Sequence, residues 1–290
     1  MSAPADRLPD DLTLGPVRLQ VADLSRSLEY YRGVLGFRLL GRSEVGARLG
    51  AQGDDTTLVE LHERGGAGPV PRRGRLGLYH FAILLPDRAA LGRFVAHLTR
   101  LGARAGASDH LVSEALYLTD PDGLGIEVYA DRPRSTWRWA GGELEMRTDP
   151  LDLDAVVAAA AGEDWTGMPP GTRIGHLHLH VGAIDRAAAF YGDALGLEPT
   201  VRGYPGALFL AAGGYHHHLG VNTWAAEASA PAEGDARLLE WTIVVPAPAA
   251  EAAARRVASA GYPAAREGDG WLLTDPWGTR LRVGPGSGVP

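Results

Sequence analysis

Apolar and polar residues alternate in short stretches along this chain, and two of these stretches lead into the same kind of helix. Residues 17–21 (VRLQV) alternate with a period of two and are followed by a helical pattern that stops at 35–37 (LGF). Residues 177–181 (LHLHV) and 195–197 (LGL) repeat this arrangement. A glycine at such a stop supplies the left-handed residue that ends a helix. Both regions therefore predict a strand followed by a helix.

A second pair of similar segments covers residues 80–103 and 240–263, and each predicts a strand followed by a longer helix. Both continue to a late strand that is entered through a four-residue turn, DPDG at 120–123 and DPWG at 275–278. The chain therefore predicts four similar units, each a strand, a helix and about three further strands. The predicted limits are a tail (1–13), two units (14–66 and 75–131), a connecting segment (132–172), two further units (173–224 and 237–284) and a second tail (285–290).

Composition and charge indicate an ordinary globular protein, because 45% of the residues are hydrophobic and 22% are charged. The formal net charge is -7 and no long basic run is present, so nucleic acid and anionic membranes are poor candidates for partners. The chain has no apolar run of about 18 residues and no secretory signal pattern at its start, which predicts a cytoplasmic protein. It contains no cysteine, so any metal must be held by His, Asp or Glu.

Four βαβββ units in one chain resemble the vicinal oxygen chelate superfamily, which includes glyoxalases, extradiol ring-cleaving dioxygenases and bleomycin-resistance proteins. The resemblance implies an α+β fold in which the four modules pair into two half-open mixed β-barrels. It also implies metal-ligand positions on the first and last strands of each unit. Applied to this chain, these positions are Pro16, His80, His176 and Glu240 on first strands and Glu60, Glu127 and Arg282 on last strands.

Only the second and third units together carry two histidines and a carboxylate at these positions. His80, Glu127 and His176 form the set of two histidines and one carboxylate that binds Fe(II) and leaves positions open for substrate and dioxygen. The second unit is therefore expected to pair with the third around a metal. Such a metal also explains why Glu127 lies in an alternating apolar strand, where an uncompensated carboxylate is costly.

The first and fourth units are expected to form a barrel without a metal. Pro16 has no donor atom in its side chain, and Arg282 is cationic. An ion pair of Arg282 with Glu240 or Glu60 is expected at the place where the other barrel holds its metal.

Residues 110–127 (HLVSEALYLTDPDGLGIE) resemble the signature of extradiol dioxygenases. The resemblance implies that Tyr117 hydrogen-bonds the metal-bound oxygen of the substrate and that His110 lines the same pocket. Ser108 departs from the small set of residues usual two places before that histidine, a difference that puts no chemical role in question.

The segment YHHHLGVNTW at 215–224 resembles the stretch that carries the acid/base histidine of these enzymes. The resemblance implies His217 for that role, and a shift of one residue would select His216 or His218. Adjacent residues of a strand face opposite ways, so the three histidines cannot all face one site. His178 and His218 are expected to contact the substrate.

The resemblance favours an extradiol dioxygenase of the catechol 2,3-dioxygenase type, which cleaves a small aromatic diol with Fe(II) and dioxygen in aromatic hydrocarbon catabolism. Mn(II) is an alternative metal, and a homo-oligomer is left open. A glyoxalase-like lyase or isomerase is the second interpretation, with Ni or Zn and a fourth ligand from His216 or His218. The third is a catalytically silent protein that binds an aromatic compound or an antibiotic, although such proteins usually lack the ligand triad.

Overall fold

The strands and helices follow the repeated order predicted from the sequence, and the computed structural model describes residues 7–286. The first unit contains β1 (Thr13–Leu14), β2 (Val17–Val21), α1 (Leu24–Gly33), β3 (Arg38–Arg42), β4 (Gly46–Gly50) and β5 (Val59–Glu63). The second contains β6 (Gly77–Leu84), α2 (Arg88–Leu101), β7 (Gly106–Asp109), β8 (Ser113–Thr119) and β9 (Gly125–Asp131).

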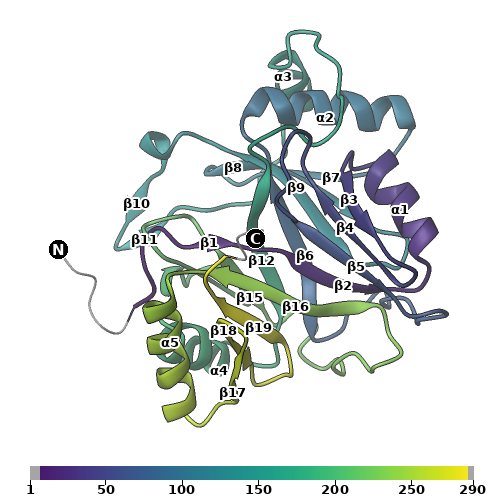
Figure 1. The fold of residues 1–290 in the computed structure, drawn as a ribbon. Helices are drawn as coiled ribbons and strands as arrows, with labels where there is room; N and C mark the ends of the chain where they lie inside the picture. Colours follow the sequence, from purple (N-terminus) through teal and green to yellow (C-terminus); the bar gives the residue numbers. More distant parts are fainter. Residues whose placement is uncertain (1–6, 287–290) are drawn as a thin grey trace.

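The third and fourth units repeat this order. The third contains β12 (Arg173–His180), α4 (Ile184–Ala187), the π-helical η2 (Ala188–Ala194), β13 (Glu198–Val201), β14 (Ala207–Ala211) and β15 (Leu219–Asn222). The fourth contains β16 (Arg237–Val244), α5 (Ala247–Ser259), β17 (Ala264–Glu267), β18 (Gly270–Thr274) and β19 (Arg280–Gly284). Between the two pairs of units lie η1 (Arg134–Thr136), β10 (Trp139–Ala140), β11 (Glu143–Leu144) and α3 (Leu153–Ala158), with α3 beside α2 at the top of Figure 1.

Two mixed β-sheets form the centre of the molecule, with the helices at its periphery (Figure 1). The order in one sheet is β13-β14-β15-β12-β6-β9-β8-β7, so the second unit shares this sheet with the third. The order in the other is β17-β18-β19-β16-β2-β5-β4-β3, with β1 beside β16, so the first unit shares it with the fourth. The predicted α+β fold and the predicted pairing of the units are confirmed.

Short polar contacts begin the first two long helices at the predicted places. The Asp23 carboxylate accepts the N–H of Arg26 at 2.9 Å and begins α1, and Asp87 accepts the N–H of Ala90 at 2.7 Å and begins α2. Such side-chain caps satisfy N–H groups that lack a partner in the first turn of a helix. Gly102 has a φ of 63° and ends α2, a conformation that glycine adopts without strain.

The two four-residue turns join the sheets to each other. Asp120 accepts the Tyr31 hydroxyl at 3.2 Å, which connects the second unit to the first. Asp275 accepts the Tyr191 hydroxyl at 2.8 Å, which connects the fourth unit to the third. The same tyrosine–aspartate contact thus recurs in both halves of the chain and holds the two sheets together.

The barrel of the first and fourth units contains the predicted ion pair. Nε of Arg282 lies 3.0 Å from Oε1 of Glu240. Glu60 pairs instead with Arg18, whose Nε lies 3.0 Å from Oε2 of Glu60. Each carboxylate at a ligand position of this barrel therefore has a guanidinium partner.

Part of the first predicted tail is packed against the protein. Leu8 and Leu12 are buried, and the N–H of Leu8 donates to the carbonyl of Gly196 at 3.0 Å. Apolar side chains explain this contact, because burying them removes apolar surface from water. Residues 1–6 and 287–290 of the predicted tails lie outside the described residues.

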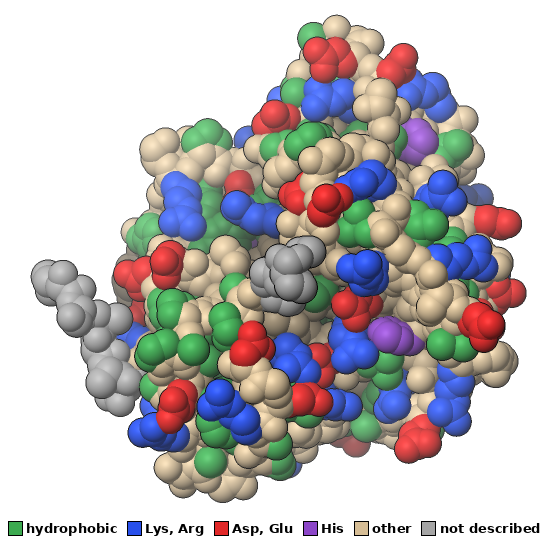
Figure 2. Space-filling view, in the orientation of Figure 1, with side chains coloured by type: hydrophobic (Ala, Val, Ile, Leu, Met, Phe, Trp, Pro, Cys, Tyr) green, Lys and Arg blue, Asp and Glu red, His purple; other side chains and the backbone are tan. Residues whose placement is uncertain are grey.

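Acidic and basic side chains are interspersed over the face drawn in Figure 2.

Candidate metal centre and active site

Three neighbouring strands place the predicted metal-binding side chains on one face of a sheet. β6 carries His80 and lies between β9, which carries Glu127, and β12, which carries His176. The Nε2 atoms of His80 and His176 lie 3.0 Å and 3.1 Å from Oε2 of Glu127. One donor atom from each residue lies within 4.8 Å of the others, and all three side chains are buried. The structure therefore brings these residues into one compact cluster.

The spacing within this cluster fits a shared metal ion. Two ligands at about 2.1 Å from a metal and at right angles lie about 3.0 Å apart. Each histidine lies at that separation from Glu127. Nε2 of His80 faces the carboxylate but makes no hydrogen bond within residues 7–286. A buried imidazole nitrogen without a hydrogen-bond partner is available to bind a metal.

Glu127 differs from two other buried glutamates in what surrounds its charge. Glu114, Glu127 and Glu240 are each 2% exposed. Glu114 lies 2.6 Å from Nε of Arg88. Glu240 lies 3.0 Å from Nε of Arg282. Within residues 7–286, only imidazoles lie in ion-pair range of Glu127, so a divalent cation would supply the positive charge that the other two carboxylates receive from arginine.

Burial controls the protonation of the side chains around the cluster. It lowers the pKa of His176 to about 4. Burial, together with neighbouring imidazoles, holds the pKa values of His178 and His217 well below the ordinary range. Burial raises the pKa of Glu127, but His176 and His80 more than offset this effect and hold the pKa well below its usual value. A carboxylate beside a neutral imidazole is the combination that binds a metal.

The strand register identifies the position from which a fourth ligand could come. In the second unit, the residue two places after His80 lies opposite Glu127. In the third unit, His178 lies two places after His176 and opposite Gly220. Gly220 therefore takes the position equivalent to Glu127 and has no donor side chain. A Cβ on Gly220 would lie 3.0 Å from Cγ of His178, so the packing also leaves little space for a larger residue.

Tyr117 and His110 form a hydrogen-bonded pair at the edge of the cluster. Nδ1 of His110 lies 2.6 Å from the carbonyl oxygen of Arg147, so it carries a proton and donates to that oxygen. Nε2 of a neutral His110 then accepts the Tyr117 hydroxyl, which lies 2.6 Å away. Burial and the charge of Glu127 raise the pKa of Tyr117 well above its ordinary value, so the hydroxyl stays protonated.

The three consecutive histidines precede β15 in irregular backbone, so the prediction that they lie on a strand is wrong. His217 lines the cavity of the cluster, and its ring centroid lies 4.1 Å from that of His176. His218 is not among the residues that line this cavity, and its Nδ1 accepts the N–H of Ala212 at 3.2 Å. The predicted contact of His218 with substrate is therefore corrected, because its ring is turned toward the connection after β14.

His216 lies beside His217 and is bound on both ring nitrogens. Its Nδ1 lies 2.7 Å from Nδ1 of His217, and its Nε2 lies 3.0 Å from Oδ1 of Asp131. The Tyr215 hydroxyl donates to the same Asp131 oxygen at 3.2 Å. His216 is thus occupied within the protein and does not serve as a fourth ligand. The sequence analysis missed Asp131, although strand alternation places it on the same face of β9 as Glu127.

A cavity of about 400 Å³ encloses the cluster and the side chains around it. Its wall contains every predicted site residue except His218. It also contains residues that the sequence pattern did not identify, namely Tyr79, Ser113, Met146, Thr148, Tyr204, Phe209 and Trp224. Met146 and Thr148 belong to the connecting segment, and the hydroxyls of Thr148 and Tyr204 lie 2.6 Å apart. The connecting segment therefore closes one side of the cavity.

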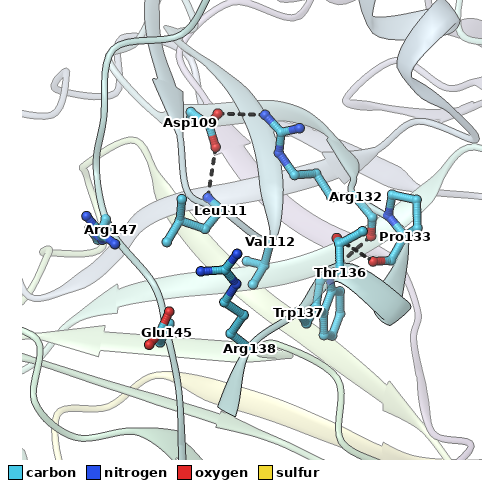
Figure 3. A pocket seen from close by; sticks show the side chains of 10 residues that line it. All are labelled: Asp109, Leu111, Val112, Arg132, Pro133, Thr136, Trp137, Arg138, Glu145 and Arg147. Carbon is cyan, nitrogen blue, oxygen red and sulfur yellow. Dashed lines mark hydrogen bonds and ion pairs between the residues drawn. The ribbon is translucent and has the colours of Figure 1, made fainter. Parts of the chain in front are cut away.

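A second pocket, of about 350 Å³, lies on the other side of this part of the connecting segment (Figure 3). Glu145 and Arg147 line that pocket, while Met146 and Thr148 line the metal cavity. Extended backbone presents successive side chains to opposite sides, which explains the alternation. This stretch of chain is thus a thin wall between the two spaces.

Contacts in the second pocket also hold the turn that carries His110 (Figure 3). Asp109 binds Nη2 of Arg132 at 2.6 Å and accepts the N–H of Leu111 at 2.8 Å. Leu111 has a φ of 68°, a left-handed conformation that costs energy in a residue with a branched side chain. The Asp109 contacts stabilise this turn, from which His110 reaches the metal cavity.

Comparison with known proteins agrees with the geometry. A profile of the Glyoxalase/Bleomycin resistance protein/Dioxygenase superfamily matches residues 13–128 and 173–283, which is more than half of the chain. The chain belongs to this superfamily. The matched regions of this superfamily member are its first two and its last two units, and the connecting segment lies between them.

Three individual proteins are similar to this chain over nearly its whole length. It is 44% identical to a protein named catechol-2,3-dioxygenase from Bacillus subtilis (strain 168), over 92% of this chain and 95% of that protein. The crystal structure of glyoxalase I from Zea mays has a TM-score of 0.54 at 18% identity, covering 95% of this chain and 92% of that one. The cppA protein from Streptococcus pneumoniae TIGR4 has a TM-score of 0.54 at 12% identity, covering 94% and 100%. The two structures support the fold alone.

None of the helices in residues 7–286 is both long enough and apolar enough to cross a membrane.

Proposed function

We propose that this protein is an extradiol ring-cleaving dioxygenase that uses Fe(II) and dioxygen to open a catechol-type ring. The observation that carries the proposal is the three-residue metal cluster beside Tyr117 and His110, with Gly220 at the position where a fourth ligand would lie. An open side on the cluster suits a substrate that binds through two adjacent oxygens. The protein named catechol-2,3-dioxygenase, 44% identical to this chain, supports the same activity.

His80, Glu127 and His176 would hold the metal in this proposal. A divalent metal bound there supplies positive charge and orientation to the two oxygens of the diol and makes dioxygen reactive toward the ring. Two histidines and one carboxylate fit Fe(II), and Mn(II) accepts the same donors.

His217 and Tyr117 would move and hold the protons of the diol. Nδ1 of His217 is engaged by His216, which leaves Nε2 to accept a proton from a substrate hydroxyl. The Tyr117 hydroxyl is kept protonated by burial and donates to His110, so its oxygen is left to accept a hydrogen bond from a substrate hydroxyl. His110 orients that hydroxyl, and His178 packs with its ring centroid 5.0 Å from that of His80, where it would contact the substrate.

The structure does not favour the two other interpretations of the sequence. A glyoxalase-like site with Ni or Zn would need a fourth ligand, but His216 is bound to Asp131 and His218 is not part of the cavity wall. A silent binding protein would have no need of three buried metal-binding side chains in one cluster. A cytoplasmic location, a homo-oligomer and a role in aromatic catabolism stay predictions from the sequence.

Anaerobic reconstitution tests the proposal. The metal-free protein is loaded separately with Fe(II), Mn(II), Ni(II) and Zn(II), and oxygen uptake is measured with catechol and substituted catechols. Ring opening is followed by the absorbance of the semialdehyde product. Oxygen uptake with Fe(II) is the expected result. A protein that consumes no oxygen with any catechol, and instead converts a glutathione hemithioacetal with Ni(II) or Zn(II), would contradict the dioxygenase assignment.

A further inference from the structure

A long cleft opens beside the metal cavity and shares part of its wall. The cleft has a volume of about 1220 Å³, compared with about 400 Å³ for the cavity. Tyr79, His80, Tyr117 and Trp224 line both spaces. Because His80 and Tyr117 belong to the candidate site itself, a ligand with one end at the metal cluster can extend directly into the cleft.

The size of this space exceeds what a simple catechol needs. Pockets of roughly 300 to 1,000 Å³ accommodate ligands as large as typical drugs. A single ring with two hydroxyls would occupy only the inner cavity, and the adjoining cleft would remain filled with water. The joined cavity and cleft are therefore suited to a diol with a substituent that reaches outward.

An exposed aromatic pair stands where the cavity meets the cleft. Tyr79 is 38% exposed and Trp224 is 50% exposed, and their ring centroids lie 5.5 Å apart in an edge-to-face arrangement. The indole N–H of Trp224 donates to the carbonyl of Pro205 at 3.2 Å, and its backbone N–H donates to Asn222 at 3.0 Å, so the ring is held in place. Large aromatic side chains held at a pocket mouth gain energy by stacking on an apolar or aromatic ligand.

The outer part of the cleft carries more positive than negative charge. Arg72, Arg73 and Arg104 line it together with one carboxylate, Glu227. None of the three guanidinium groups has a hydrogen-bond or ion-pair partner within residues 7–286. The whole chain has a net charge of -7, so the positive charge of this cleft is opposite in sign to the net charge of the protein. Such a lining attracts an anionic group and repels a cationic one.

The basic loop of the cleft is anchored to the rest of the protein. The N–H of Val70 donates to the carbonyl of Asp122 at 2.9 Å, and the N–H of Gly74 donates to that of Pro71 at 2.8 Å. Gly74 has a φ of 75°, and a Cβ there would lie 2.9 Å from Nε2 of His180, so the turn needs glycine. These contacts position the segment that carries Arg72 and Arg73.

We propose that the substrate is a catechol with an aromatic or apolar arm that ends in an anionic group such as a carboxylate. The diol end would bind at the metal cluster, which rests on the proposed function above. The arm would pass across the exposed surfaces of Tyr79 and Trp224, and the anionic end would lie near Arg72, Arg73 and Arg104. The site would thus select its substrate through the anionic end of the arm, which lies far from the ring bond that is cleaved at the metal cluster.

Binding to the metal-free protein tests the cleft separately from the chemistry. The probes are an aryl catechol with both hydroxyls methylated, with and without a carboxylate on the distal ring, and their dissociation constants are measured by calorimetry. We expect the carboxylated probe to bind roughly fivefold more tightly at low salt, because each exposed charge contact contributes modestly, and the difference to shrink at high salt. Equal binding of the two probes would overturn the proposal.

Variants of the basic loop provide the matched control. Arg72→Gln with Arg73→Gln should remove the preference for the carboxylated probe. With the metal-loaded enzyme, this double variant should lower kcat/KM for a carboxylated aryl catechol roughly fivefold and leave catechol itself unchanged. The control is Arg255→Gln with Arg266→Gln, which removes two exposed charges from α5 and β17. An equal effect of the control would show only a change in net charge and overturn the proposal. If no catechol is cleaved but the probes still discriminate, the proposed function fails and the anionic subsite stands.

Discussion

The Nδ1 atoms of His216 and His217 lie 2.7 Å apart, so one ring donates a hydrogen bond to the other. Oδ1 of Asp131 lies 3.0 Å from Nε2 of His216 and accepts a hydrogen bond from the N–H at that nitrogen. In a neutral His216 the remaining nitrogen can only accept, so Nδ1 of His217 is the donor. Nε2 of His217 is then left with a free lone pair, which is the form that a general base requires.

The first prediction is that Asp131→Asn reverses this hydrogen-bond pattern. The amide NH₂ of asparagine donates to Nε2 of His216, so Nδ1 of His216 carries the proton and Nδ1 of His217 must accept. The lone pair of His217 is then no longer on Nε2, and kcat should fall by at least about 100-fold with little change in metal content. Nitrogen-15 spectra of the metal-free protein report the tautomer directly, and the variant should show His217 protonated on Nε2.

Glu145→Gln serves as the control for this first prediction, since it makes the same change of a carboxylate to an amide in the neighbouring pocket. It should leave both kcat and the His217 spectrum as in the wild type. An Asp131→Asn variant with unaltered spectrum and activity would show that Asp131 has only a packing role.

The second prediction concerns the buried carboxylate of the cluster. Glu127→Gln should lower metal affinity by more than about 100-fold, because a neutral amide is a poor ligand in this set. The same change should lower the free energy of unfolding of the metal-free protein at neutral pH, because it removes the carboxylate that His176 and His80 stabilise and whose pKa they hold well below its usual value. Metal analysis after dialysis and urea unfolding provide the two measurements.

Glu240→Gln is the matched comparison for Glu127→Gln, because Glu240 is equally buried but paired with Arg282. It should retain the metal and lose about 1.5 to 3 kcal/mol of stability, because Arg282 loses its charged hydrogen bond to Glu240 and keeps its contacts with Glu267. Full metal content in the Glu127→Gln protein would refute the assignment of the ligands.

The third prediction separates proton transfer from metal binding. Tyr117→Phe and His217→Ala should both keep the metal and both slow oxygen consumption with catechols. The His217 change should be more severe, about 100-fold to 10,000-fold in kcat, because it removes the proton acceptor, while Tyr117→Phe removes a single hydrogen bond. Loss of metal from the His217 variant would instead indicate that His217 is a ligand.

The fourth prediction concerns the pH dependence of stability at His218. Burial, followed by nearby imidazoles, lowers the pKa of His218 from 6.5 to about 3. Below pH 6.5 the unfolded chain takes up a proton that the folded protein does not, so stability is present above that pH and is lost as pH falls toward 3. Between pH 7 and pH 5 this group should cost the wild type about 2 kcal/mol.

His218→Gln tests this pH dependence, because the glutamine oxygen can still accept the N–H of Ala212. The stability difference between wild type and variant, measured by urea unfolding, should change in favour of the variant as the pH is lowered from 7 to 5. A difference that stays constant across this range would contradict the prediction.

The sequence by itself determined the four units and selected the three residues that the structure brings together as candidate metal ligands. Alternation of apolar residues and the Asp-Pro turns at 120 and 275 are local features, and the backbone responds to them within a few residues. The ligand positions were implied by the resemblance to the superfamily, which places them on the first and last strands of each unit. Only the second and third units combine two histidines and a carboxylate at these positions, so the sequence assigned no metal to the other barrel.

Only the tertiary structure decided how the cavity is closed and which histidine faces it. His217 and His218 differ by one residue, and irregular backbone before β15 broke the alternation on which the sequence argument depended. Met146 and Thr148 reach the site because the connecting segment folds back across the sheet, far in sequence from the ligands. The strand register places Gly220 opposite His178, at the position where a fourth ligand would otherwise lie. Such relationships depend on contacts between distant parts of the chain, and local sequence patterns do not encode them.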